Sequence, residues 1–158
     1  MLAPGTAWLY SLISGGELPG QVTYGEAFAV QPFSNSLVTL TLTGEQLKAV
    51  LEQQATAGSD GTGRMLQISY SLTYTWSLSA PVGSKVSDIK INGVPVDPAA
   101  SYRVTVNNFL AGGGDGFTAL TAGTDLLTGM IDLDAFVAYL TANSPVAPGP
   151  QNRITKVP

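Results

Sequence analysis

The residues best suited to chemistry in this chain are aromatic and acidic side chains held in proline- and glycine-rich segments. Phe33 lies in Pro32-Phe33-Ser34-Asn35, just before an alternating apolar run, and Phe109 and Asp115 lie in residues 107–117, where four glycines surround the aspartate. An exposed ring can stack on a nucleobase, which contributes about 1–3 kcal/mol per base. Glycine lets a backbone approach a ligand, and a carboxylate accepts hydrogen bonds from sugar hydroxyls. Together these residue types indicate a site for a base and its sugar.

Both segments also have simpler interpretations. A phenylalanine beside a strand end packs in the core more often than it binds a ligand. The glycine segment could be only a hairpin or bulged loop, with Asp115 as a turn residue. We interpret Asp132 and Asp134 as residues of a helix N-terminus, and Asp60 as a solvated loop residue. Pattern alone therefore leaves the ligand site and the structural interpretation both open.

The chain of 158 residues excludes much common catalytic machinery by its composition. It contains no His and no Cys, so it has no imidazole base, no thiolate nucleophile and no disulfide. Its 7 basic and 11 acidic residues leave a net charge of −4, and the basic runs that bind nucleic acid polymers are missing. No apolar run approaches the roughly 20 residues of a membrane span, and no cationic start indicates a signal peptide. We therefore expect neither a nucleic acid polymer nor a membrane as partner.

The elements that position these segments begin with a strand and a helix. Residues 37–42 alternate apolar and threonine side chains, which predicts a strand with one buried face. Thr43-Gly44-Glu45-Gln46 is a capping box and predicts a helix that ends by Gly58. Residues 66–76 alternate over six periods and predict the clearest strand of the chain.

The second half predicts a hairpin, another strand and a last helix. Asn92-Gly93 suits a two-residue hairpin turn whose second arm carries Pro95 and therefore lies at a sheet edge. Residues 102–106 predict the strand that leads into the glycine segment. A final helix is expected from Asp132, which would cap it, with apolar side chains buried at helical spacing. Hairpins mixed with helices predict an α+β domain with mixed sheets covered by helices.

Four motifs of this sequence resemble, in order and spacing, the C-terminal domain of the 5′-nucleotidase family, which includes UDP-sugar hydrolases and 2′,3′-cyclic-nucleotide phosphodiesterases. The motifs are Val22-Thr23-Tyr24-Gly25-Glu26, Val30-Gln31-Pro32-Phe33-Ser34-Asn35, Leu42-Thr43-Gly44-Glu45-Gln46-Leu47 and Asn107–Phe117. The resemblance divides the chain into a divergent N-terminal segment, residues 1–19, and a 5′-nucleotidase C-terminal-like domain, residues 20–158. It implies a four-layer α/β/β/α domain with two mixed sheets.

The resemblance also implies a substrate-binding site. Phe33 and Phe109 would clasp the base between their rings, and Asp115 would bind the ribose hydroxyls. The other expected pocket residues are Asn35, Asn108 and Gly114. We expect a nucleoside or nucleotide as the ligand, with no catalytic residue and no metal ligand in this chain.

Two positions depart from the family pattern. The family carries an Asn-Pro-Gly-Gly-Ile-Arg segment whose arginine contacts the substrate, and the nearest match here is Ala3-Pro4-Gly5-Thr6-Ala7-Trp8. Trp8 thus stands near the place of that arginine, which affects phosphate recognition. Ser34 replaces the usual glycine, a minor steric change.

The family hydrolyses phosphate esters at a site of two divalent metals that activate water. The ligands of those metals belong to a separate N-terminal metallophosphoesterase domain and include histidine, which this chain lacks. We therefore expect no cofactor in this chain and no hydrolysis by it alone, with a catalytic domain in trans as one arrangement. Family members commonly act in the periplasm, outside the cell or at its surface, but the sequence leaves localisation open.

A second class of function stays open beside the first. The chain could be a structural or dimerisation module with no ligand, in which the apolar segment Ala7–Ile13 covers an exposed face or pairs two copies into a homodimer. An independent catalytic domain has little support, because the chain lacks imidazole and thiol groups.

Overall fold

The computed structural model describes residues 21–158 except residues 59, 62 and 148. Expectations for residues 1–20, namely the divergent segment, Ala7–Ile13 and Trp8, lie outside the described residues. The described elements are α1 (Tyr24–Val30), β1 (Ser36–Thr43), α2 (Gly44–Gln53), β2 (Leu72–Ser77), β3 (Val86–Ile91), β4 (Val94–Pro95), β5 (Ser101–Asn107), α3 (Asn108–Ala111), η2 (Gly114–Gly116), η3 (Thr118–Ala122), β6 (Thr124–Ile131), α4 (Asp132–Asn143) and β7 (Ile154–Val157). None of the helices in this part of the chain has the length and apolar character needed to cross a bilayer.

Two sheets organise the molecule. Sheet A has the strand order β5-β1-β6 and is antiparallel throughout, whereas sheet B has the order β4-β3-β2-β7 and is mixed, because β7 runs parallel to β2. The expected α+β class with two sheets and covering helices is confirmed. In sheet A, Leu37 pairs with Asn107 and Thr43 with Ser101. The segment before β1 and the segment after β5, which carry Phe33 and Phe109, therefore adjoin the same end of sheet A.

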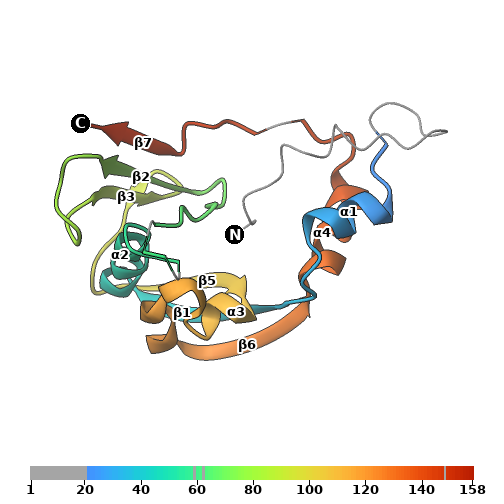
Figure 1. Cartoon of the computed structure of the whole chain (residues 1–158), viewed down its shortest axis with the longest axis horizontal. Helices are drawn as coiled ribbons and strands as arrows, with labels where there is room; N and C mark the ends of the chain where they lie inside the picture. Colours follow the sequence, from blue (N-terminus) through green and yellow to red (C-terminus); the bar gives the residue numbers. More distant parts are fainter. Residues whose placement is uncertain (1–20, 59, 62, 148) are drawn as a thin grey trace.

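Helix α2 lies between the two sheets (Figure 1). The capping box forms as expected: the Thr43 hydroxyl accepts from the Gln46 backbone N–H at 3.2 Å, and the Gln46 side chain accepts from the Thr43 N–H at 2.8 Å. Val50 packs in the core cluster of β1, and its neighbour Leu51 packs in the cluster of β2 and β3. One helix thus supplies apolar side chains to both sheets. The four-layer order implied by the resemblance stays a prediction.

Buried polar side chains join α2 to sheet B. The Glu52 carboxylate accepts hydrogen bonds from the backbone N–H groups of Lys85, at 2.9 Å, and Val86, at 2.8 Å. The Gln54 side chain accepts from the Leu66 N–H at 2.7 Å and donates to the Tyr74 hydroxyl at 3.0 Å. Burial raises the pKa of the Tyr74 phenol, an effect that its hydrogen bond with Gln54 partly offsets.

The predicted strand over residues 66–76 is wrong in its first half. Only Leu72–Ser77 forms a strand, because a turn closed by the Leu72 N–H and the Ser69 carbonyl, 3.2 Å apart, interrupts the run. Leu66 and Ile68 are still buried on alternate positions, but the Leu66 N–H bonds to the Gln54 side chain instead of a neighbouring strand. The alternating pattern of residues 66–76 therefore predicted which side chains are buried, but not which residues pair in a sheet.

The hairpin and the last helix match the expectations with one correction. Asn92 and Gly93 both have positive φ, 51° and 79°, as a two-residue hairpin turn requires. Helix α4 begins at Asp132, but Asp132 is not its N-cap: that position is Ile131, which provides no side-chain cap. The Asp132 carboxylate instead accepts from the Leu133 N–H at 2.8 Å. Helices α1 and α4 pack together in a third core cluster beyond one end of sheet A (Figure 1).

Candidate functional site

The two phenylalanines predicted to hold a base are both exposed. Phe33 lies in the turn between α1 and β1 with 72% of its surface exposed, and Phe109 is 51% exposed. The interpretation of these rings as core residues is therefore wrong. We expected Phe109 in a loop, but it lies in the short helix α3. Asn107 caps this helix by accepting from the Leu110 N–H at 2.8 Å.

The Asn108 side chain links the segment before β1 to the segment after β5. Asn108 begins α3, and its side-chain oxygen accepts from the backbone N–H of Ser36 at 2.9 Å. Ser36 directly follows Asn35, which is half-buried and whose backbone carbonyl accepts from the Asp132 N–H at 2.8 Å. Asn108 therefore fixes α3 beside the start of β1. The structure brings the segments of the two rings together, and the face-to-face arrangement of the rings stays a prediction.

Gly114 provides the space that the Phe109 ring occupies. A Cβ atom on Gly114 would lie 2.6 Å from both Cε1 and Cζ of Phe109, a separation at which one of the two groups must move. The ring thus lies directly against the backbone of the glycine segment. Gly113 and Gly116 have φ of 87° and 86°, so glycine suits both positions.

Asp115 lies in the same turn in the left-handed region, with a φ of 53°, and its residue is exposed. Its backbone carbonyl accepts from the Gly58 N–H at 2.6 Å. Aspartate tolerates this conformation better than most residues, so the turn needs little strain to present its carboxylate. Ser34 also has a left-handed φ, of 52°, which explains why the family has glycine there.

The contact between Gly58 and Asp115 was missed from the sequence. A Cβ on Gly58 would lie 2.8 Å from the guanidinium carbon of Arg64, so this arginine packs close to the backbone that holds the Asp115 turn. Arg64 also pairs with Asp60 at 3.4 Å, so Asp60 has a partner in addition to solvent. Gly58, with a φ of 94°, therefore both follows the end of α2 and contacts the Asp115 turn. The close spacing of glycines in residues 58–63 was the one sequence feature that could have indicated this contact.

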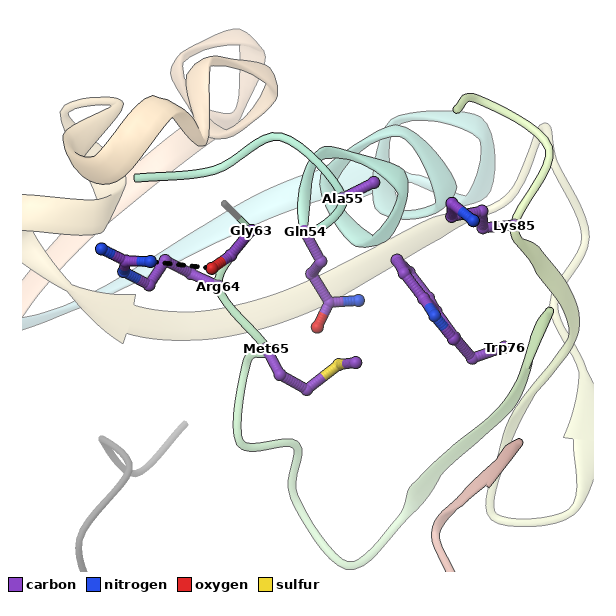
Figure 2. Close-up of a pocket in the computed structure, with 7 residues that line it drawn as sticks. All are labelled: Gln54, Ala55, Gly63, Arg64, Met65, Trp76 and Lys85. Carbon is purple, nitrogen blue, oxygen red and sulfur yellow. Dashed lines mark hydrogen bonds between the residues drawn. The ribbon is translucent and has the colours of Figure 1, made fainter. Parts of the chain in front are cut away.

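A shallow pocket of about 310 Å³ lies beside Arg64, beneath the end of α2. Figure 2 shows Trp76, Gln54 and Met65 around it, with Lys85 above the indole ring. The Lys85 ammonium is 5.8 Å from the ring centroid of Trp76 and donates to the Leu78 carbonyl at 3.1 Å. This pocket contains none of the six predicted site residues. Its Gln54 side chain serves the contact between α2 and sheet B through Tyr74, and its Lys85 ammonium bonds to the carbonyls of Ser77 and Leu78.

The residues of this chain do not fit the two-metal site of the family. The full sequence has no histidine. Among the residues that the structure describes, no group of three or more His, Cys, Asp or Glu side chains is placed to hold a metal ion.

The fold and these motifs define the C-terminal domain of 5′-nucleotidases. The family model described as "5'-nucleotidase, C-terminal domain" matches residues 9–122, and the chain belongs to this family. A 5′-nucleotidase-related protein of Glossina morsitans morsitans is 38% identical over 146 residues, which cover 86% of this chain and 26% of the relative. Protein UshA of Escherichia coli is 33% identical over 147 residues, which cover 87% of this chain and 25% of the relative.

A solved structure agrees with these relatives. The 5′-nucleotidase precursor of Thermus thermophilus matches with a TM-score of 0.78 and 38% identity, covering 86% of this chain and 28% of that chain. The chain thus spans about a quarter of the length of these relatives.

Proposed function

We propose that this chain is the domain that binds the nucleoside part of a nucleotide for a 5′-nucleotidase-type hydrolase. The observation that carries the proposal is the pair of exposed rings, Phe33 and Phe109, on segments joined at one end of sheet A. Because these two large aromatic side chains are exposed, they do not pack in the core, and exposed apolar groups that lie together often mark a binding site. Family membership and the printed names of the relatives support nucleotide chemistry as their purpose.

Each residue has a distinct role in this proposal. The two rings stack on the base, which is sequence-tolerant because every base has a π-face. Asp115 accepts hydrogen bonds from vicinal ribose hydroxyls, and a charged acceptor makes such bonds stronger. Asn35 and Asn108 line the wall between the rings, and Gly114 leaves room for the Phe109 ring beside its backbone.

Hydrolysis belongs to a metallophosphoesterase domain in this proposal. The phosphate group would be held there, so the isolated chain retains only the stacking and ribose contacts and binds weakly. With divalent metal added, the chain alone is expected to hydrolyse AMP at the background rate. Metal-dependent hydrolysis by the chain alone would contradict this division of roles.

The test is a calorimetric titration of the full chain with adenosine and AMP. Phe33→Ala and Phe109→Ala are each expected to weaken binding about 5- to 150-fold, since one stacked base contributes about 1–3 kcal/mol. Tyr70→Ala is the matched control, because Tyr70 is 77% exposed but precedes β2 of sheet B. Absence of saturable binding, or equal binding by all three variants, would contradict the proposal.

Two further variants separate the base from the sugar. Gly114→Ala displaces the Phe109 ring, because its Cβ would lie 2.6 Å from that ring, and should weaken adenosine and its 2′,3′-dideoxy analogue alike. Asp115→Asn should weaken adenosine and leave the dideoxy analogue unaffected. The same loss for both ligands in Asp115→Asn would contradict the ribose assignment.

A further inference from the structure

The turn that carries Asp115 has little in its own sequence to fix its shape. Residues 112–116 contain four glycines, and Gly113, Asp115 and Gly116 all have left-handed backbone angles, with φ of 87°, 53° and 86°. Glycine populates many backbone conformations at similar energy, so such a segment has a large conformational entropy to lose on folding. A binding group on this turn therefore depends on contacts from other elements to hold it in one position.

The end of α2 supplies such contacts. The Gly58 N–H donates to the Asp115 carbonyl at 2.6 Å. Gln53, the half-buried last residue of α2, makes two side-chain hydrogen bonds just after the turn. Its side-chain oxygen accepts from the Ala119 N–H at 3.0 Å, and its side-chain nitrogen donates to the Thr118 hydroxyl at 2.8 Å.

Gln53 also organises the chain that leads to Gly58. Its backbone carbonyl accepts from the N–H groups of Thr56, at 3.0 Å, and Ala57, at 2.9 Å. Ala57 directly precedes Gly58 and is buried in the core cluster of β1. Gln53 thus contacts both flanks of the hydrogen bond between Gly58 and Asp115, with its main chain on one flank and its side chain on the other.

We propose that Gln53 is a positioning residue that holds Asp115 where its carboxylate meets the ribose hydroxyls. This inference rests on the proposed function, because the ribose is the group that Asp115 is expected to bind. Gln53 acts through Thr118 and Ala119 and has no contact with the ligand in this proposal. Without its two side-chain hydrogen bonds the turn samples more conformations, and ribose binding must then also order the turn, which weakens it.

The base-binding segment has a different anchor, so the effect of Gln53 should fall mainly on the sugar. Asn108 holds α3, and with it Phe109, by accepting from the Ser36 N–H at the start of β1. The side-chain hydrogen bonds of Gln53 go to residues on the other side of Asp115. Their loss should therefore weaken binding of the ribose more than stacking on the base.

The neighbouring glutamine provides a matched control. Gln54 also lies at the end of α2, but its side chain bonds to the Leu66 N–H at 2.7 Å and to the Tyr74 hydroxyl at 3.0 Å, on the side of sheet B. Gln54→Met should therefore lower stability without releasing the Asp115 turn. Gln53→Met removes both side-chain hydrogen bonds to the segment after that turn and keeps an unbranched side chain of similar volume.

The first test compares adenosine with 2′,3′-dideoxyadenosine by calorimetric titration, at a temperature at which circular dichroism shows every variant to be folded. Gln53→Met should weaken adenosine binding about tenfold, as expected for roughly one lost hydrogen bond to a charged group, and should weaken the dideoxy analogue less than about twofold. Gln54→Met should leave the ratio of the two affinities unchanged. Equal weakening of both ligands in Gln53→Met would overturn the proposal.

A conservative variant tests whether the hydrogen bonds of Gln53 are the cause. In Gln53→Glu the carboxylate can accept from the Ala119 N–H and also from the Thr118 hydroxyl, which is able to donate. Gln53→Glu should therefore restore most of the preference for adenosine that Gln53→Met loses. A loss in Gln53→Glu as large as in Gln53→Met would overturn the assignment of these hydrogen bonds.

The variant Asp115→Asn separates failure of this inference from failure of the proposed function. If Asp115→Asn removes the preference for adenosine and Gln53→Met keeps it, the proposed function stands and the positioning role of Gln53 is overturned. If Asp115→Asn keeps the preference, the ribose assignment is wrong and the role of Gln53 is overturned with it.

The second test needs no ligand. The Gly58 N–H is bonded to the Asp115 carbonyl, so its hydrogen exchange measured by NMR reports how firmly the turn is held. Relative to the best-protected amides of β1, Gln53→Met should speed this exchange at least about fivefold, the factor expected for one lost hydrogen bond. Gln54→Met should leave the relative rate unchanged. An unchanged relative rate in Gln53→Met would overturn the proposal.

Discussion

The two sheets of this domain differ in the side chains that they bury and expose. Sheet B meets α2 through buried polar side chains that are all bonded, as Glu52, Gln54 and Tyr74 show. In the described residues, no buried side-chain nitrogen or oxygen lacks a partner. Sheet A instead leaves phenyl rings exposed at one end and an apolar strand exposed at one edge. Both sides of α2 have an apolar core, so the sheets differ in what they expose: the rings of the proposed binding site lie at one end of sheet A.

The largest expected effect compares a buried side chain between α2 and sheet B with an exposed ring at the end of sheet A. Leu51→Ala removes a side chain that is 0% exposed between α2 and sheet B, and should lower the free energy of unfolding by about 2–5 kcal/mol. Phe33→Ala removes a larger side chain that is 72% exposed, and should change that free energy by no more than about 0.5 kcal/mol. Urea unfolding measures both. Similar losses in the two variants would mean that Phe33 is not the exposed ring that the structure shows.

The next effect tests the buried carboxylate. Glu52→Gln keeps the shape of the side chain but puts an N–H₂ group against one of two backbone donors, the N–H groups of Lys85 and Val86. We expect a loss of about 1–3 kcal/mol, because a buried donor is left unpaired. Glu45→Gln is the control, because Glu45 is an exposed residue of the same helix. It should lower the free energy of unfolding by no more than about 0.5 kcal/mol. If Glu52→Gln left the free energy of unfolding unchanged, the carboxylate would not be what holds the loop before β3.

The smallest effect concerns alkaline pH. The pKa of Tyr74 is raised above its ordinary 10.0 by burial, so the unfolded chain releases this proton at a lower pH than the folded chain. Stability from this group is complete below pH 10.0 and is lost as the pH rises through the raised pKa. Urea midpoints measured upward from about pH 9 should therefore decline less steeply in Tyr74→Phe than in the parent chain. Tyr70→Phe is the exposed control, and an identical slope in Tyr74→Phe would contradict the assignment.

Local sequence signals predicted the elements that depend on few residues. The capping box of α2 needs only Thr43 and Gln46, and the hairpin turn needs only Asn92 and Gly93, so their residue types were sufficient. Strand β1 was predicted because one of its faces is buried along its whole length. These are elements whose structure is fixed within a few residues of the chain.

Elements fixed by distant parts of the chain were not predicted. Residues 66–69 alternate like a strand, yet their partner is the Gln54 side chain of α2. Strand β6 was missed because it is exposed on both faces and bulged against β1, so its sequence has no alternation. Strand β7 was missed because its 4 residues carry too short a pattern.

For the candidate site, the sequence named residues but did not indicate the contacts that the structure shows for them. The resemblance named Asn108 and Gly114, but their roles emerge from contacts with Ser36 and the Phe109 ring. The contact of Gly58 with Asp115 joins residues 57 positions apart, and no periodicity indicates such a contact.

The position of α2 has a consequence for how this domain folds. Val50 and Leu51 are adjacent in the chain and serve different cores. Neither core is complete until that single helix has docked, so loss of either one removes support from the other. The domain should consequently melt in one cooperative step, with no stable half-folded species to populate along the way.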